Sequence, residues 1–143
     1  MLYGISKLIS PELIKVLMEM GHGDEIVLAD GNFPAMSHGA TVIRADGHGM
    51  VPLLEEILKL FPLDAYVEKP AALMQVVQGD TVETPIWDQF VSIFRQHTSL
   101  TEPFEHLDRF AFYERARKAC AVVATGEGAQ YANIILKKGV ITE

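Results

Sequence analysis

Two spacings of hydrophobic residues run along this chain, and each predicts a different element. In some segments the apolar residues recur every three or four positions, as on one buried helix face; the first such set is Leu13, Val16, Leu17 and Met20. Between these segments lie short, continuous apolar runs, which indicate strands that are buried on both faces. We expect such strands at residues 26–29, 41–43, 72–77, 120–124 and 133–136.

Helix boundaries support this division of the chain. Ser10 is a typical N-cap, Pro11 suits the first helical position, and Gly21 is a typical stop. Further helices are expected between Pro52 and Phe61, from Thr84 through Phe94, and over residues 112–119, with loops at 30–39 and 125–130. Alternation of helices and buried strands predicts a single α/β domain over residues 1–143, with three α/β/α layers around a mainly parallel sheet.

Composition and charge exclude several classes of function. The net charge is −7 and no basic run exceeds two residues, which argues against a nucleic-acid partner. The single cysteine, Cys120, precludes an internal disulfide and lies in an apolar run typical of a core. Residues 1–9 lack the apolar stretch of a signal peptide, and no segment approaches 18 apolar residues. We therefore expect a cytoplasmic protein without a membrane partner.

The candidate chemistry begins at the turn Gly21-His22-Gly23. Histidine readily exchanges protons near neutral pH, and flanking glycines let the backbone bend sharply. Asp30 follows the strand expected at 26–29, at the sheet edge where open α/β sheets place their ligands. Both side chains are thus candidates for one pocket. The alternative is that Gly21 only ends a helix and His22 only completes a turn.

Two further segments carry hydrogen-bonding groups of the kind found in sugar sites. Arg109 precedes aromatic residues and suits a hydroxyl-rich ligand, although a structural ion pair explains it nearly as well. Tyr131-Ala132-Asn133 follows a glycine loop and offers a phenol and an amide, unless that loop only closes on itself. The five histidines lack metal-ligand spacing, and the glycines match no dinucleotide or phosphate-loop motif, so no metal or cofactor is expected.

Taken together, these segments resemble the L-fucose mutarotase branch of the D-ribose pyranase/fucose mutarotase family. The resemblance is collinear and covers the whole chain. It rests on Ile9-Ser10-Pro11-Glu12-Leu13, Gly21-His22-Gly23-Asp24-Glu25-Ile26, Asp30 with Phe33-Pro34-Ala35, Val42-Ile43-Arg44-Ala45-Asp46-Gly47, Arg109-Phe110-Ala111-Phe112-Tyr113-Glu114-Arg115-Ala116, Thr125-Gly126-Glu127, and Tyr131-Ala132-Asn133-Ile134-Ile135-Leu136-Lys137-Lys138-Gly139.

The resemblance implies an RbsD-like fold and an isomerase that interconverts the α and β anomers of free L-fucose without a metal or cofactor. It implies His22 as the proton donor, and Asp30, Arg109, Tyr131, Ala132 and Asn133 as the sugar-binding set. It also implies a homo-oligomer, a decamer in this family, with the pocket between neighbouring subunits.

Three alternatives stay open at this point. The ribose branch is similar but carries a histidine in place of Arg109, so the chain is either a fucose enzyme or a D-ribose pyranase or other monosaccharide mutarotase. A non-catalytic sugar-binding module with the same pocket, or a metal-dependent hydrolase or lyase built on the histidines, would belong to different classes.

One feature of the sequence itself favours an oligomer. The chain has more large aromatic residues than one small core obviously needs: Trp87, Phe90, Phe94, Phe104, Phe110 and Phe112.

Overall fold

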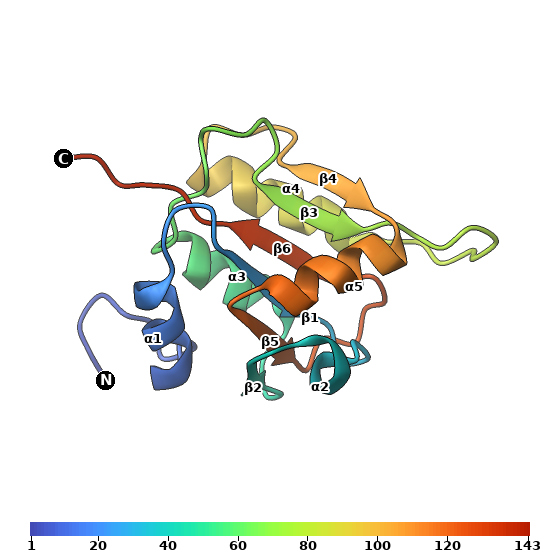
Figure 1. The fold of residues 1–143 in the computed structure, drawn as a ribbon, viewed down its shortest axis with the longest axis horizontal. Coiled ribbons are helices and arrows are strands. Elements are labelled where there is room, and N and C mark those ends of the chain that lie inside the picture. The colour runs from blue at the N-terminus through green and yellow to red at the C-terminus, as the bar shows by residue number, and fades with distance from the viewer.

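The computed structural model describes all of residues 1–143 as six strands and five helices (Figure 1). In chain order these are α1 (Pro11–Glu19), β1 (Glu25–Ala29), α2 (Ala35–His38), β2 (Val42–Ala45), α3 (Met50–Leu58), β3 (Ala71–Met74), α4 (Ile86–His97), β4 (Phe104–Leu107), α5 (Arg109–Lys118), β5 (Ala121–Thr125) and β6 (Ile134–Lys137). None of the five helices has both the length and the apolar character needed to cross a membrane.

All six strands form one sheet in the order β2-β5-β1-β6-β3-β4. Every neighbouring pair is parallel except those made by β6, which runs antiparallel to both β1 and β3. The expected α/β class and mainly parallel sheet are therefore confirmed. The reversed direction of β6 matters for the site, because it brings the start of β6 to the edge where β1 ends.

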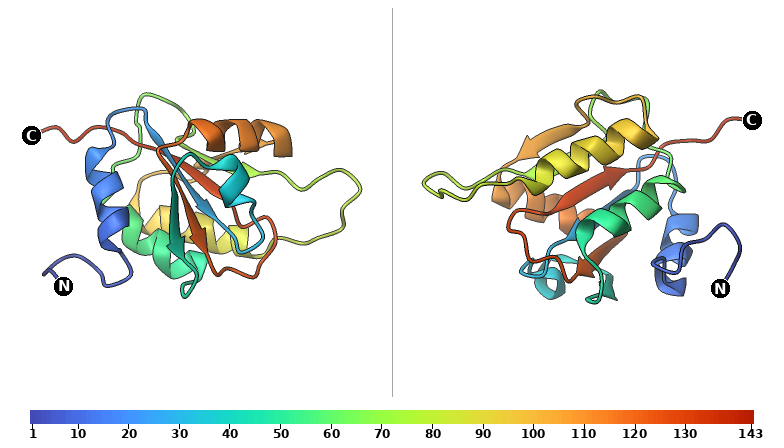
Figure 2. Two further views of the ribbon diagram at one scale, coloured as in Figure 1. Left: turned by 60° about the horizontal axis from the view of Figure 1, so that its bottom comes forward. Right: turned by 180° about the vertical axis from the view of Figure 1, so that it is seen from behind.

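Helices cover both faces of the sheet (Figures 1 and 2). Successive residues of β1 point to opposite faces, so Ile26 and Leu28 join one core while Val27 and Ala29 join the other. The larger core includes buried residues of α1, α3 and α4, and the smaller core includes residues of α2 and α5. The three layers expected from the sequence are thus present.

The predicted start of α1 is confirmed, because the Ser10 hydroxyl accepts a hydrogen bond from the Leu13 amide at 3.1 Å and Pro11 is the first helical residue. Two short elements were not expected. The segment predicted as a loop over 30–39 contains α2, and β4 was overlooked at the sheet edge, where it pairs only with β3. Several boundaries also differ by three residues: β3 ends at Met74 rather than residue 77, and α5 begins at Arg109 rather than residue 112. Likewise α3 ends at Leu58 rather than Phe61, and α4 ends at His97 rather than Phe94.

The expected aromatic surplus is not at the surface. Phe90, Phe94 and Phe112 are fully buried, Phe104 is buried against Phe94 with ring centroids 4.8 Å apart, and Trp87 is partly buried. These rings fill the two cores on either side of the sheet. Of the six aromatic residues in that prediction, only Phe110 is largely exposed, at 70%. The aromatic count was therefore wrong as an argument for an oligomer.

Candidate functional site

A cavity of about 390 Å³, lined by both polar and apolar side chains, lies at the carboxyl end of β1. It combines the loop after β1, the first residue of α5 and the segment that leads into β6. Four of the expected sugar-binding residues line it, and seven further residues complete the wall: Asp30, Arg109, Tyr131 and Asn133, with Asn32, Phe33, Pro34, Met74, Val77, Tyr113 and Gln130. Ala132, the fifth, is fully buried behind this wall.

The reversed strand β6 explains how residues near 30 and near 133 meet. Leu28 is the register partner of Ile134, so Asn133 enters the sheet beside the residue where β1 ends. The Asp30 amide donates to Asn133 Oδ1 at 2.8 Å, and Asn133 Nδ2 donates to Asp30 Oδ2 at 3.1 Å. Both residues are buried. The two side chains therefore form a fixed pair of donors and acceptors on the pocket wall.

Burial disfavours the charged form of the Asp30 side chain. Burial raises the pKa of its carboxyl above the ordinary value, and hydrogen bonds from the backbone of Asn32 and Ala132 and from the Asn133 side chain only partly oppose this. The Asn32 amide, for example, donates to Asp30 Oδ1 at 3.0 Å. A carboxylate kept in such a place serves better as a strong acceptor for a bound ligand than as a source of stability.

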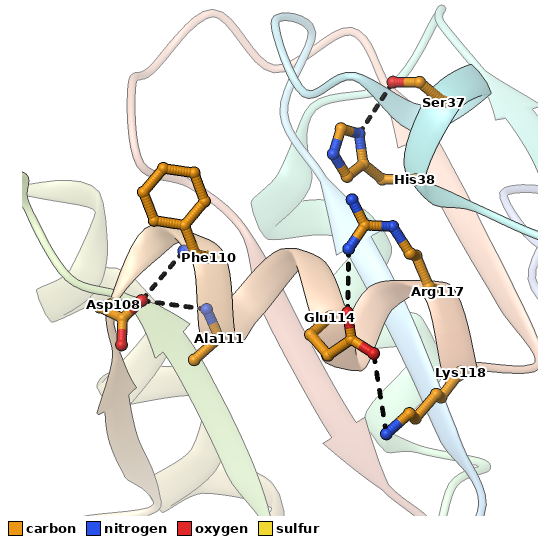
Figure 3. A network of polar contacts seen from close by, with 8 residues as sticks. All are labelled: Ser37, His38, Asp108, Phe110, Ala111, Glu114, Arg117 and Lys118. Carbon is orange, nitrogen blue, oxygen red and sulfur yellow. Dashed lines mark hydrogen bonds and ion pairs between the residues drawn. The ribbon is translucent and has the colours of Figure 1, made fainter.

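Arg109 reaches the same pocket from the first turn of α5. The Asp108 carboxylate caps this helix by accepting from the Phe110 and Ala111 amides, both at 3.0 Å, which fixes the direction of the first turn (Figure 3). The guanidinium carbon lies 4.8 Å from the centroid of the Phe110 ring. No carboxylate lies within ion-pair distance of Arg109, whereas Arg115 and Arg117 on the same helix both form such pairs. The structural ion pair considered for Arg109 is therefore absent.

Tyr131 is held in the pocket wall by contacts that the sequence did not suggest. It is the one residue other than glycine with a positive φ, at 57°, in the left-handed region. Trp87 Nε1 donates to its carbonyl oxygen at 2.8 Å, and its hydroxyl donates to Asp80 Oδ2 at 2.6 Å. Asp80 lies in the long loop between β3 and α4, which projects from the body of the molecule (Figure 1). The Tyr131 backbone is thus held by α4, and its hydroxyl by the loop between β3 and α4.

His22 lies at the other end of β1. It belongs to the turn before Glu25, whereas Asp30 follows Ala29, so the five residues of β1 separate them, about 16 Å of strand. The His22 side chain is 44% exposed, and its Nε2 lies 3.1 Å from Oδ1 of the buried Asp64. The structure does not bring His22 and Asp30 to one pocket within a single chain. No three His, Cys, Asp or Glu side chains anywhere in the chain converge as metal ligands would.

Comparison with known proteins agrees with this fold. The family model described as the RbsD / FucU transport protein family matches residues 3–141. An L-fucose mutarotase of Actinobacillus pleuropneumoniae is 54% identical over 140 residues, which cover 98% of this chain and 97% of the relative.

Two crystal structures are similar along nearly their whole length. FucU from Bifidobacterium longum is 57% identical with a TM-score of 0.95, covering 97% of this chain and 99% of that one. The fucose mutarotase from Streptococcus pneumoniae in complex with L-fucose is 50% identical with a TM-score of 0.94, covering 99% and 100%. The fold, the family model and the full-length similarity lead to one conclusion: the chain belongs to the RbsD / FucU family.

Proposed function

We propose that this protein is an L-fucose mutarotase, an isomerase that interconverts the α and β anomers of the free sugar. One observation carries the proposal: Asp30, Arg109 and Tyr131, with Asn133, line one cavity in a chain whose full-length relatives include a fucose mutarotase in complex with L-fucose. The cavity volume of about 390 Å³ lies in the range of small-molecule sites.

The binding set suits a ligand with several neighbouring hydroxyl groups. Arg109 only donates hydrogen bonds and ionised Asp30 only accepts them, so together they fix the direction of hydrogen bonds to two hydroxyls. Tyr131 and Asn133 add neutral groups, and the backbone beside the buried Ala132 closes the wall between them. Charge-assisted bonds of this kind are each worth about 1.5–3 kcal/mol.

The reaction needs little more than a proton donor and a proton acceptor. A proton is delivered to the ring oxygen and one is removed from the anomeric hydroxyl, so the ring opens to the aldehyde. Rotation about the bond between C1 and C2 then presents the other carbonyl face, and reversal of the proton transfers closes the ring as the second anomer. We assign the proton donor to His22, and such a group contributes about 10²–10⁴-fold.

His22 reaches a sugar in the Asp30 pocket when a neighbouring subunit supplies it. We propose that the active protein is a homo-oligomer, a decamer as the family resemblance implies, whose pockets lie between subunits. Large apolar side chains are exposed near both halves of such a site: Tyr66 and Val67 follow Asp64, and Phe110 and Val77 flank the pocket. Exposed apolar groups of this kind favour contact with another copy of the chain.

Saturation-transfer NMR on the anomeric protons of L-fucose and D-ribose tests the activity. We expect the protein to accelerate exchange of fucose more than ribose, and His22→Ala to slow it by about 10²-fold or more. Asp46→Asn, at an exposed carboxylate paired with Arg44, is the matched control and should exchange at the normal rate. Binding of fucose without faster exchange would instead identify a sugar-binding module, and loss of activity with a chelator would identify a metal enzyme.

Subunit mixing tests the shared pocket. Inactive His22→Ala and inactive Asn133→Ala proteins are dissociated, mixed and reassembled. If each pocket takes His22 from one subunit and Asn133 from its neighbour, some hybrid pockets regain both residues and activity returns. No recovery in a sample shown to contain mixed oligomers, or a monomer in light scattering, would contradict the shared site.

A further inference from the structure

Tyr131 adopts a backbone conformation that its side chain disfavours. Its φ of 57° lies in the left-handed region, where a Cβ comes too close to the following carbonyl oxygen and which glycine usually occupies. Such a conformation persists where the surrounding structure holds it. No main-chain hydrogen bond does so, since neither the amide nor the carbonyl of Tyr131 is bonded to another backbone group. The contact that holds this residue therefore comes from a side chain.

That side chain belongs to Trp87, the second residue of α4. Its Nε1 donates to the Tyr131 carbonyl oxygen at 2.8 Å, across 44 positions of sequence. An indole N–H only donates hydrogen bonds, so this contact has a single possible direction. Trp87 is not among the residues that line the cavity. Any effect of the indole on a bound ligand must therefore pass through Tyr131 and its neighbours.

The indole is itself held in place by packed parts of the structure. Trp87 is partly buried against the larger core, and its amide donates to the Thr84 carbonyl at 3.0 Å where α4 begins. The His106 ring of β4 contacts it, with the two ring centroids 5.3 Å apart. The Tyr131 hydroxyl, by contrast, is bonded to Asp80 in an exposed loop. The main chain of Tyr131 is thus tied to the core, whereas its phenol is tied to the surface.

The bond to Trp87 fixes a whole peptide unit and not only one oxygen atom. A peptide unit is planar, and in its trans form the C=O and the N–H point in opposite directions. The unit that begins with the Tyr131 carbonyl ends with the Ala132 amide. This amide donates a hydrogen bond to the Asp30 carboxylate. One rigid peptide unit therefore joins the indole of α4 to the carboxylate of the pocket.

We propose that Trp87 is a positioning residue for the pocket, because its indole N–H fixes the peptide between Tyr131 and Ala132. This peptide turns the Ala132 amide toward Asp30 and sets where the Tyr131 side chain lines the cavity. The inference rests on the proposed function, since it takes this cavity as the sugar site. Without the indole N–H the peptide is free to rotate, and the Asp30 carboxylate loses a donor that orients it. Sugar affinity should then fall although no residue that lines the cavity has changed.

The test removes the N–H and keeps an aromatic ring. Trp87→Phe deletes the donor, and 3-benzothienylalanine introduced at position 87 by nonsense suppression replaces the N–H by sulfur in a ring of nearly the same shape. We expect both proteins to bind L-fucose about tenfold more weakly in calorimetric titration, as for one lost hydrogen bond. 5-Fluorotryptophan at position 87 keeps the N–H and should restore the affinity. Asp88→Ala, the next residue of α4 and outside the cavity, is the matched control and should bind normally.

Two results of this titration would overturn the positioning role and leave the proposed function standing. One is equal affinity of the benzothienylalanine protein and the wild type, which would limit the indole N–H to supporting the fold. The other is an equal loss of affinity in the 5-fluorotryptophan protein, because the shape of the ring and not its N–H would then be responsible. If Trp87→Phe fails to fold, the two proteins with tryptophan analogues still decide the matter.

A spectroscopic measurement tests the contact without a sugar. Trp87 is the only tryptophan of the chain, so ultraviolet resonance Raman spectroscopy detects one indole, and the frequency of its N–H-coupled ring vibration depends on hydrogen bonding at Nε1. We expect a hydrogen-bonded indole in the wild type and also in Tyr131→Phe, because the acceptor belongs to the main chain. A free indole in the wild type would contradict the positioning role whatever the titration gives. A bonded indole in a protein that binds no L-fucose would overturn the proposed function, and this role with it.

Discussion

Asp30 and Asn133 form two reciprocal hydrogen bonds across 103 positions of sequence, one to the Asp30 amide and one to its carboxylate. Each residue thereby satisfies polar groups of the other that are shielded from water. The pair joins the end of β1 to the start of β6, two strands that are neighbours in the sheet. This part of the pocket wall consequently also links two strands of the sheet, so its residues affect stability as well as binding.

Asn133→Ala should therefore lower the free energy of unfolding, by about 1–3 kcal/mol, because the buried Asp30 amide and carboxylate each lose a partner. Urea denaturation measures this change. Asn32→Ala is the matched control, since Asn32 lines the same pocket but interacts with Asp30 through its backbone amide, which the substitution keeps. Equal stability of the two variants would contradict the role of the Asn133 side chain as a link between the strands.

The raised pKa of Asp30 predicts how stability depends on pH. Because the folded protein binds this proton more tightly than the unfolded chain, falling pH stabilises the fold through Asp30, from above its folded pKa down to about pH 4. Asp30→Asn lacks this contribution. The free energy of unfolding of the wild type minus that of Asp30→Asn should thus increase between about pH 8 and about pH 4 in urea denaturation at several pH values. A difference that decreases as the pH falls would show that Asp30 is not penalised by burial.

Arg109 should matter for sugar affinity and little for stability. It forms no ion pair, and the helix that carries it is capped by Asp108. We expect Arg109→Ala to weaken L-fucose binding by about 1.5–3 kcal/mol in calorimetric titration, with a nearly unchanged unfolding midpoint.

Arg117→Ala is the control on the same helix, because Arg117 pairs with Glu114 at 3.0 Å outside the pocket (Figure 3). This variant should bind fucose normally. Unchanged affinity of Arg109→Ala would place Arg109 outside the binding set.

Much of the fold could be predicted because burial on both faces leaves continuous apolar runs, as in β1 and β5, whose residues are almost all buried. The elements that were overlooked lack this signal. β4 pairs on one side only and contains half-buried and exposed residues, and α2 spans four residues without a side-chain cap. Neither is long enough to display a period that distinguishes helix from strand.

The position of a candidate residue was predictable where it follows from its place in an element. Asp30 follows a buried strand and Asn133 precedes one, so strand ends alone point to both. Asp64 and Asp80 were not found, because their partners His22 and Tyr131 lie 42 and 51 positions away with no spacing rule between them. Contacts between loops depend on how β6 and its neighbours pack, which the hydrophobic pattern does not encode.

The contact between Asp80 and Tyr131 predicts a further effect on the pocket. The hydrogen bond to Asp80 is the main reason that the pKa of the Tyr131 hydroxyl is raised. Because the hydroxyl proton is committed to Asp80, the phenol oxygen faces its other neighbours as an acceptor, and the Val77 amide already approaches it at 3.4 Å. Asp80→Ala should free the hydroxyl proton and lower the pKa of Tyr131.

Absorbance of tyrosinate during an alkaline titration measures this shift. The chain has four tyrosines, and the part of the titration that is missing in Tyr131→Phe belongs to Tyr131. Asp80→Ala should also weaken fucose binding, since the loop between β3 and α4 then loses its side-chain contact with the pocket wall. Asp88→Ala, at the start of α4 and outside the pocket, is the control and should change neither quantity. If the titration of Asp80→Ala coincides with that of the wild type, Asp80 does not hold the Tyr131 proton, and the loop must be held in place by its backbone alone.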